Sequence, residues 1–477
     1  MCDSGHDLRQ TRRQFFGTSA LSLAPLALAS LLDEAGAHEA HSAGAGPFAP
    51  RPPHHAPRAK RVIFLYMVGG PSQIDLFEPK SALVERDGQP IPESYLKGIK
   101  FAQIQEKQPR LMGSPWRFAR HGQCGADVSE LLPHTATVVD HLSIVKTMKA
   151  DDTNHAFAEL QMNTGWRRFG RPSMGSWISY GLGSESRDLP GFTVLLSGMR
   201  PRSKSANYGN GFLPSAYQGV PLRATGDPIL NLSSPAGFTP KRERRTLETI
   251  RALDAARFDV TGDPEIAARI SAYEMAFRMQ TSAPRLLDLS SETAETLAMY
   301  GIADAARPTF ARNCLLARRL VERGVRFVQL FHGDWDHHSH IASGLPDQCR
   351  QTDQPAAALV KDLAARGLLD ETLVIWGGEF GRSSVAQGPK DANVGRDHNI
   401  DAFTMWLAGG GIRPGQTLGT TDELGCFAAG DSFHIYDLQA TILHLLGLDH
   451  ERLTYRFQGR DFRLTDVYGN VIEKLLA

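Results

Sequence analysis

The 477-residue chain has little cysteine and no excess of either charge. Its five cysteines are Cys2, Cys124, Cys314, Cys349 and Cys426, and no two of them form a Cys-x-x-Cys pair. This spacing excludes zinc sites of the cysteine type, and we expect buried small hydrophobic residues, although one or two disulfides could form in an oxidising compartment. Basic and acidic residues number 52 each, so no overall field favours nucleic acid as a partner.

The N-terminus has the features of a targeting segment. Adjacent Arg12 and Arg13 precede an apolar run from Phe15 to Leu32, and small residues follow at 35–37. The run is short for a membrane-spanning helix, and it contains Gly17, Ser19 and Pro25. We therefore predict a twin-arginine signal peptide over 1–37, export to the periplasm or beyond, and no stable membrane insertion after processing. An uncleaved membrane anchor is the alternative.

The rest of the chain predicts one α/β domain. With 42% hydrophobic and 22% charged residues the composition is that of a globular protein. Apolar runs that end in glycine or polar loops alternate with segments of helical periodicity, which indicates a three-layer αβα sandwich with a large, mostly parallel central sheet. We expect a flexible leader over 38–60, the domain over 61–477, long loops over 198–240 and a helical excursion over 241–300. The expected strands are 61–68, 325–331, 372–376 and 402–408, and the expected helices are 264–279, 291–299, 309–323, 354–366 and 438–446.

A dense group of metal-ligating residue types follows the expected strand 325–331. Asp336 and His338 are two residues apart, so in extended chain both side chains project to one side and can chelate one ion. His332, Asp334, His337 and His340 are close by in the sequence. Carboxylate and imidazole without thiolate favour zinc, manganese or another divalent cation. The alternative is a solvated polar loop.

Further candidates follow other expected strands. Asp75 lies in the loop after the first strand, and Glu379 follows two glycines after the strand 372–376. Glu379 is a candidate ligand, with a salt bridge to Arg382 as the alternative.

The next loop contains Arg396, Asp397 and His398. Asp397 and His398 are candidate ligands, and Arg396 could neutralise an oxyanion or pair with Asp397. Nearer the C-terminus, Asp437 could act as a ligand with His434 or serve only as the N-cap of a helix.

The order of these segments resembles the alkaline phosphatase and sulfatase superfamily. The resemblance rests on the first strand with its glycine-rich loop, on 372–382, on Arg396-Asp397-His398 and on 437–447. More closely, Gly69–Phe77, Gly170–Trp177 and Trp335–His338 resemble the DUF1501 family, and the resemblance covers roughly residues 60 to 477.

The superfamily implies a site where two metal ions clamp a phosphate or sulfate ester. On this resemblance Asp336, His338 and His398 correspond to ligands of the first metal. This chain departs from the pattern at the second metal, where Glu379 replaces an aspartate and Phe380 a histidine, and Asp75 comes later in its loop than usual.

The resemblance also locates the position of the nucleophile. Sulfatases have cysteine or serine about nine residues before a Thr-Gly pair, and with Thr164-Gly165 as that pair the position holds His155. His155 could be a further metal ligand, with a metal-bound hydroxide in place of a covalent nucleophile. Thr153 is the alternative nucleophile.

Together these features predict an exported, metal-dependent hydrolase of phosphate or sulfate esters. The substrate would be a small-molecule or polysaccharide ester, and the cofactor one or two divalent ions, namely zinc, manganese or calcium. His155, Thr153 and Arg396 are the catalytic candidates. The alternative is a non-catalytic metal- or glycan-binding surface protein on a hydrolase scaffold.

Overall fold

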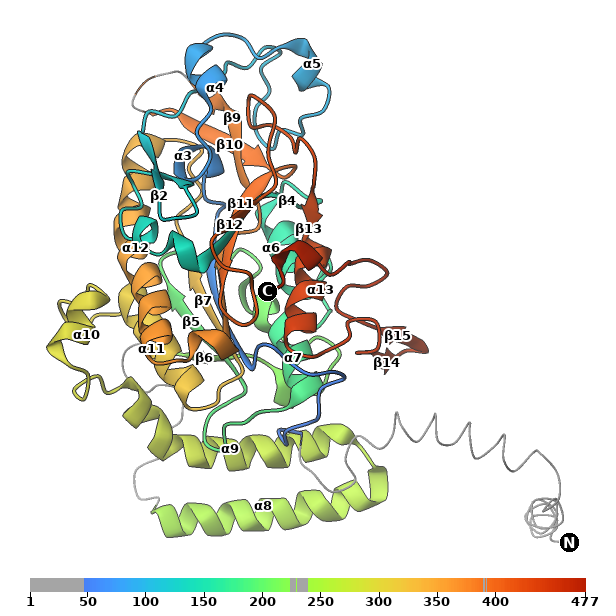
Figure 1. The fold of residues 1–477 in the computed structure, drawn as a ribbon. Coiled ribbons are helices and arrows are strands. Elements are labelled where there is room, and N and C mark those ends of the chain that lie inside the picture. Colours follow the sequence, from blue (N-terminus) through green and yellow to red (C-terminus); the bar gives the residue numbers. More distant parts are fainter. Residues whose placement is uncertain (1–46, 224–228, 230–238, 389–390, 392) are drawn as a thin grey trace, which may run out of the picture. The chain divides into compact units, whose positions relative to one another are not determined.

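A computed structural model describes residues 47–223, 229, 239–388, 391 and 393–477 (Figure 1). The expected signal peptide over 1–37 and the first part of the expected leader lie outside these residues. Among the helices of the described residues, none has the length and hydropathy that crossing a bilayer requires.

A nine-stranded sheet forms the centre of the fold, in the order β12-β4-β11-β8-β1-β7-β5-β6, with β13 also paired to β4. Only β11 runs antiparallel to its neighbours, β4 and β8. The expected mostly parallel sheet is therefore confirmed. The strands are β1 Arg61–Met67, β4 Leu142–Lys149, β5 Phe192–Ser197, β6 Val220–Leu222, β7 Phe327–His332, β8 Thr372–Gly377, β11 Phe403–Ala408, β12 Gln416–Leu418 and β13 Phe433–His434.

Helices cover both faces of the sheet, as the continuous apolar run of β1 requires. Along β1, Ile63 and Leu65 belong to one hydrophobic core, whereas Phe64 and Tyr66 belong to another. The first core contains α11 and α12, and the second contains α6, α7 and α13, which gives three layers (Figure 1). The helices are α3 Gln73–Leu76, α4 Ser81–Glu85, α5 Glu93–Leu96, α6 His155–Thr164, α7 Met174–Leu182, α8 Pro240–Thr261, α9 Pro264–Leu287, α10 Ala294–Met299, α11 Phe310–Glu322, α12 Ile341–Ala365 and α13 Ile435–Leu445.

In the described part of the chain, three two-stranded hairpins stand apart from the central sheet. They are β2 Phe118–His121 with β3 Ala126–Ser129, β9 Gly381–Gln387 with β10 Gly395–Asn399, and β14 Tyr455–Phe457 with β15 Arg460–Phe462. The first strand of the β9–β10 hairpin begins four residues after β8 ends. This hairpin therefore stands at the carboxyl end of the central strands.

The differences from expectation are central strands that were not expected, β4 and β5 among them, and helix boundaries. The helix expected over 354–366 begins at Ile341, because burial against α11 outweighs the helix-breaking effect of Pro346 and Pro355. The excursion forms α8, α9 and α10, with α8 packed against α9. The long loop region contains β6 and short 3₁₀ segments, and part of it lies outside the described residues.

The described part of the expected leader is hydrogen-bonded to the rest of the domain. The backbone amides of His54 and Arg58 donate to the carbonyls of Gly447 and Leu445 at the end of α13. Cys314, Cys349 and Cys426 are buried free thiols, as expected of small hydrophobic residues, and Cys124 is a half-buried free thiol.

Candidate metal centre

The parallel register of three central strands brings the candidate loops together. β1 pairs in parallel with both β7 and β8, so the segments that follow these strands leave the same edge of the sheet. Asp336 and His338 follow β7, and Glu379 follows β8. Gly69, with φ +113°, follows β1 and packs directly against the backbone of Asp336, where a side chain would collide.

Two further elements carry histidines to the same place. Asn154 caps α6 by accepting from the amide of Ala156, so His155 is the first residue of that helix. His398 belongs to β10.

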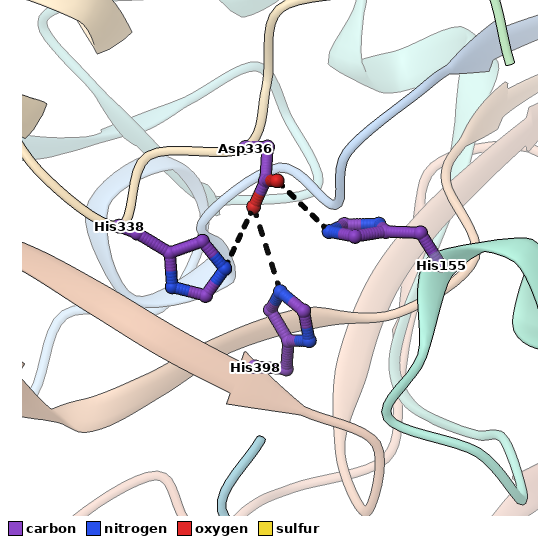
Figure 2. Close-up of side chains that lie close together, drawn as sticks. All are labelled: His155, Asp336, His338 and His398. Atoms are coloured by element: carbon purple, nitrogen blue, oxygen red, sulfur yellow. Dashed lines mark hydrogen bonds and ion pairs between the residues drawn. The ribbon is translucent and has the colours of Figure 1, made fainter. Parts of the chain in front are cut away.

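Four side chains form a candidate metal-binding group, named the metal cluster below, which consists of His155, Asp336, His338 and His398 (Figure 2). One ligand atom of each lies within 4.8 Å of all the others. The Nε2 atoms of His338 and His398 lie 3.0 Å and 3.5 Å from Oδ1 of Asp336. Nε2 of His155 lies 3.1 Å from Oδ2 of the same carboxylate. Three imidazoles therefore point one nitrogen each at a single carboxylate.

The other nitrogen of each ring has an acceptor. Nδ1 of His155 lies 2.6 Å from Oε1 of Glu379, and Nδ1 of His398 lies 2.6 Å from the carbonyl oxygen of Thr153. Nδ1 of His338 lies 2.5 Å from Oε1 of Gln387. Because these oxygens accept, each Nδ1 carries the proton and each Nε2 is left to bind a cation. This is the arrangement of metal-ligating histidines, whose second nitrogen donates to a carboxylate or carbonyl.

Glu379 lies behind His155 and outside the group of four. Its buried carboxylate accepts from the amide of Gly69 at 2.9 Å and from His155. The structure thus gives it the place of a positioning residue, which fixes the tautomer and orientation of the His155 ring.

Two arginines balance the charge of Asp336. Buried Arg382 donates to Oδ1 of Asp336 at 2.7 Å and to the carbonyl of Gly70 at 3.0 Å, so it links the loops after β1 and β7. The sequence suggested a salt bridge between Glu379 and Arg382. In the structure Arg382 pairs with Asp336 instead. Arg202 lies 3.5 Å from Oδ2 of Asp336, and its side chain is 52% exposed. Neither arginine was assigned to the site from sequence.

Burial and hydrogen bonding shift the pKa values of the cluster side chains in different directions. Burial opposes ionisation of Asp336, but its contacts with the three histidines and the Arg382 charge outweigh burial and hold its pKa well below the usual range. Burial likewise opposes charge on His155, but hydrogen bonds to Asp336 and Glu379 outweigh it and raise its pKa to about 9. For His398, burial prevails over the hydrogen bond to Asp336 and lowers the pKa to about 3.

The metal-free cluster therefore holds a proton on His155 at neutral pH, and a cation must displace it. We expect zinc binding at pH ~7.5 to release about one proton, because a coordinating imidazole must be neutral. Calorimetric titration in buffers of different ionisation enthalpy measures this number, which should fall towards zero as the pH rises through about 9. An enthalpy independent of buffer at pH ~7.5 would contradict the assignment.

The same pKa shift makes the metal-free fold sensitive to pH. Since the pKa of His155 is raised above the ordinary histidine value of 6.5, the protonated ring stabilises the folded state fully below about pH 6.5. This stabilisation is lost as the pH rises through about 9.

Three of the residues selected from sequence have other partners. Asp75 forms a buried ion pair with Arg396, whose Nε and Nη2 donate to its two oxygens at 2.8 Å and 3.0 Å. Arg396 is thereby committed to Asp75 rather than to Asp397 or to an oxyanion. Oδ2 of Asp397 accepts three backbone amides from residues 102–104 at 2.9–3.0 Å. Thr153 reaches the cluster through its carbonyl, which accepts from His398.

The remaining candidates are used elsewhere. His332 contacts Ser197 and Gln348, and burial lowers its pKa to about 4. Asp437 is the third helical residue of α13, where His434 is the N-cap and the two form a capping box. Asp437 therefore has a structural role at the helix start. It is the third helical residue rather than the expected N-cap, because the helix begins at Ile435 instead of Leu438.

Comparisons with known proteins complete the description of the site. The model of a family described as a protein of unknown function (DUF1501) matches residues 59–476. No curated protein matches the sequence significantly.

Solved structures share a distant likeness with the chain. The lipoteichoic acid synthase LtaP from Listeria monocytogenes is 9% identical, with a TM-score of 0.35 over 87% of this chain and 78% of its own. A protein in the alkaline phosphatase superfamily from Vibrio parahaemolyticus is 13% identical, with a TM-score of 0.37 over 90% and 74%. The alkaline phosphatase from the Antarctic bacterium TAB5 is 10% identical, with a TM-score of 0.33 over 82% and 99%. Likeness this distant assigns no activity to the chain.

Proposed function

This chain belongs to the DUF1501 family, a family of unknown function, and from the geometry of its own site we propose that it is a metal-dependent hydrolase of phosphate or sulfate esters. One observation carries the proposal. Three imidazoles, each held at Nδ1 by an acceptor, direct Nε2 at one carboxylate. Without a cation these nitrogens share a single counter-charge, whereas a divalent ion would use all four ligands.

The donor set indicates which metal the cluster would hold. Three nitrogens and a carboxylate fit zinc or manganese, whereas calcium prefers a shell of oxygens. Within the described residues the cluster is the one group of three or more such side chains that lie close enough to share an ion. We therefore propose one zinc or manganese ion, held by His155, Asp336, His338 and His398. When bound, such an ion polarises an ester oxygen and neutralises developing charge.

The chain's own residues would divide the remaining work. Arg202 is half exposed beside Asp336, so its guanidinium can bind the non-bridging oxygens of a phosphate or sulfate group. Its backbone is held in place because buried Glu159 on α6 accepts from the amides of Arg202 and Ser203, at 2.9 Å each. Buried Arg382 keeps Asp336 ionised and oriented. Glu379 orients the His155 ring through its contact with Nδ1.

The test is hydrolysis of p-nitrophenyl phosphate and p-nitrophenyl sulfate by the purified chain, with zinc, manganese or calcium restored. The decisive comparison is His155→Ala against Thr153→Ala, with bound metal measured on both. His155→Ala should lose metal and turnover together. Thr153→Ala should retain both, since the cluster uses only its backbone carbonyl.

Two outcomes would reject this mechanism. If Thr153→Ala alone abolishes turnover while the metal stays bound, the Thr153 hydroxyl is the nucleophile. If the chain binds metal but hydrolyses neither ester class with any of the three metals, the non-catalytic binding protein is favoured. That alternative draws support from His155, a cluster member that stands where the superfamily pattern has a covalent nucleophile.

We also propose that the chain is exported by the twin-arginine pathway and acts in the periplasm or outside the cell. The support is the pair Arg12-Arg13 with the apolar run that follows it. N-terminal sequencing of exported material should find the mature chain beginning close to His38. A mature chain that still begins near Met1 would indicate an uncleaved anchor instead.

A further inference from the structure

A large cleft lies beside the segment that carries His155. Its volume is about 1190 Å³, larger than the ~300–1,000 Å³ usual for small-molecule pockets. Four stretches of chain line it, within 151–157, 166–168, 434–437 and 467–470, together with Glu451. None of the four cluster side chains lines it.

The cleft and the metal cluster nevertheless share one segment. Asp151 and Asp152 line the cleft and directly precede Thr153, whose carbonyl accepts from His398. Phe157 lines the cleft two residues after His155. A ligand lying in the cleft is therefore bounded by the same stretch of chain that supports the cluster.

A stack of three rings lines the cleft. The rings of His434 and Tyr436 have centroids 4.8 Å apart at an interplanar angle of 20°, and those of Tyr436 and Tyr468 are 4.9 Å apart at 25°. Tyr436 is buried, whereas Tyr468 is 55% exposed. The stack thus ends in a tyrosine that is open to solvent. Phe157 and Val467, which are also exposed, line the same cleft.

Hydrogen bonds hold this stack in place before any ligand arrives. Nδ1 of His434 accepts from the amide of Tyr436 at 3.2 Å, and its Nε2 donates to Asp151 at 3.1 Å. The hydrogen bond from His434 lowers the pKa of Asp151 to about 2, so this carboxylate is ionised. Asp437 accepts from the amides of His434 and Asn470, which ties the two stretches that carry the rings. A pre-formed surface loses little entropy on binding.

The polar groups of the cleft are mixed in sign. Asp151, Asp152, Asp437 and Glu451 are acidic, and Arg167 and Arg168 are basic. This balance disfavours nucleic acid, which needs a predominantly basic surface. It suits a ligand whose groups both donate and accept hydrogen bonds, as hydroxyl groups do.

We propose that this cleft binds carbohydrate, and that the substrate of the metal centre is an ester carried on a sugar chain. A sugar ring has an apolar C–H face that can lie on the open ring of Tyr468, and hydroxyl groups that reach the surrounding carboxylates and guanidinium groups. The volume accommodates several sugar units. The inference rests on the proposed hydrolase function for the identity of the reaction, and on the cleft alone for binding.

The test is affinity gel electrophoresis of the full chain through gels that contain dextran, pullulan, laminarin, chondroitin sulfate or heparin. At least one polymer should retard the chain, and Tyr468→Ala should weaken that retardation about tenfold. Tyr273→Ala is the matched control, because Tyr273 is an exposed tyrosine on α9 that does not line the cleft. It should leave retardation unchanged.

Retardation is measured with metal restored and after chelation, and aryl ester turnover is measured on the same protein. The carbohydrate cleft and the hydrolase function can then be rejected independently of each other. Turnover of aryl esters without retardation by any polymer would overturn the carbohydrate cleft alone. Retardation that depends on Tyr468, with no ester turnover, would support the cleft and reject the hydrolase. Equal loss in Tyr468→Ala and Tyr273→Ala would also overturn the cleft, because the effect would not be specific to its ring stack.

Discussion

Replacing Asp336 by asparagine is expected to remove the bound metal and to lower ester hydrolysis by more than ~100-fold. The amide keeps the shape of the side chain but removes the negative charge that Nε2 of each cluster histidine contacts. Loss of a residue that merely orients a ligand costs ~10–100-fold in metal affinity or activity, so loss of a ligand should cost more. Arg382 would then be left buried without its carboxylate partner.

Asp334→Asn is the matched control for this substitution. Asp334 is an exposed residue two positions before Asp336 in the sequence. Among the described residues, its carboxylate accepts a hydrogen bond only from the amide of Met199, at 3.2 Å. Its φ of +76° is one that asparagine tolerates, so the variant should fold normally. Metal content by elemental analysis and turnover are compared in the two variants. Turnover that survives in Asp336→Asn would show that the activity comes from another site or from a contaminant.

The sequence predicted that the candidate loops share one edge of the sheet, because the central strands are continuous apolar runs. The runs that became β1 and β8 end in glycine pairs, and the polar segments after β1, β7 and β8 must then share one edge of the sheet. Asp336 and His338 were identifiable as a pair from their two-residue spacing. β4 was not predicted, since the polar residues Ser143, Lys146 and Thr147 interrupt its apolar pattern.

The sequence could not show which of two neighbouring candidates, Asp397 or His398, faces the cluster. Asp397 and His398 are adjacent on β10, so their side chains point to opposite sides. The register of β10 against β9 shifts between Arg396 and His398. With this register His398 faces the cluster, and Asp397 faces the amides of residues 102–104. Such a shift depends on long-range pairing and leaves no local signature in the sequence.

The arginines around the cluster were missed for a related reason. Arg202 lies in a segment read as a long loop, and its position depends on hydrogen bonds to Glu159, which is far away in the sequence. For Arg382 the sequence suggests only a possible salt bridge to Glu379. Whether it pairs with Glu379 or Asp336 depends on side-chain directions that the tertiary structure sets.

Replacing Arg396 by methionine is expected to destabilise the fold by ~3–5 kcal/mol, because it leaves the Asp75 carboxylate buried without its partner. Both side chains are fully buried, and the guanidinium also donates to the carbonyl of Met112 at 2.9 Å. Arg396 thereby ties the loop at Met112 and the short helix α3 to the β9–β10 hairpin that carries His398. Chemical denaturation measures the free energy of unfolding, with Arg456→Met as the control.

Arg456 forms an ion pair with Asp461 at 3.2 Å, but both side chains are largely exposed. Solvent screens such a pair, so Arg456→Met should leave the free energy of unfolding nearly unchanged. In the double variant Arg396→Met/Asp75→Leu no unpaired charge is left buried, and much of the lost stability should return. If Arg396→Met instead leaves stability intact and lowers only ester turnover, Arg396 acts on the reacting group rather than on the fold, and its assignment to the ion pair with Asp75 is incomplete.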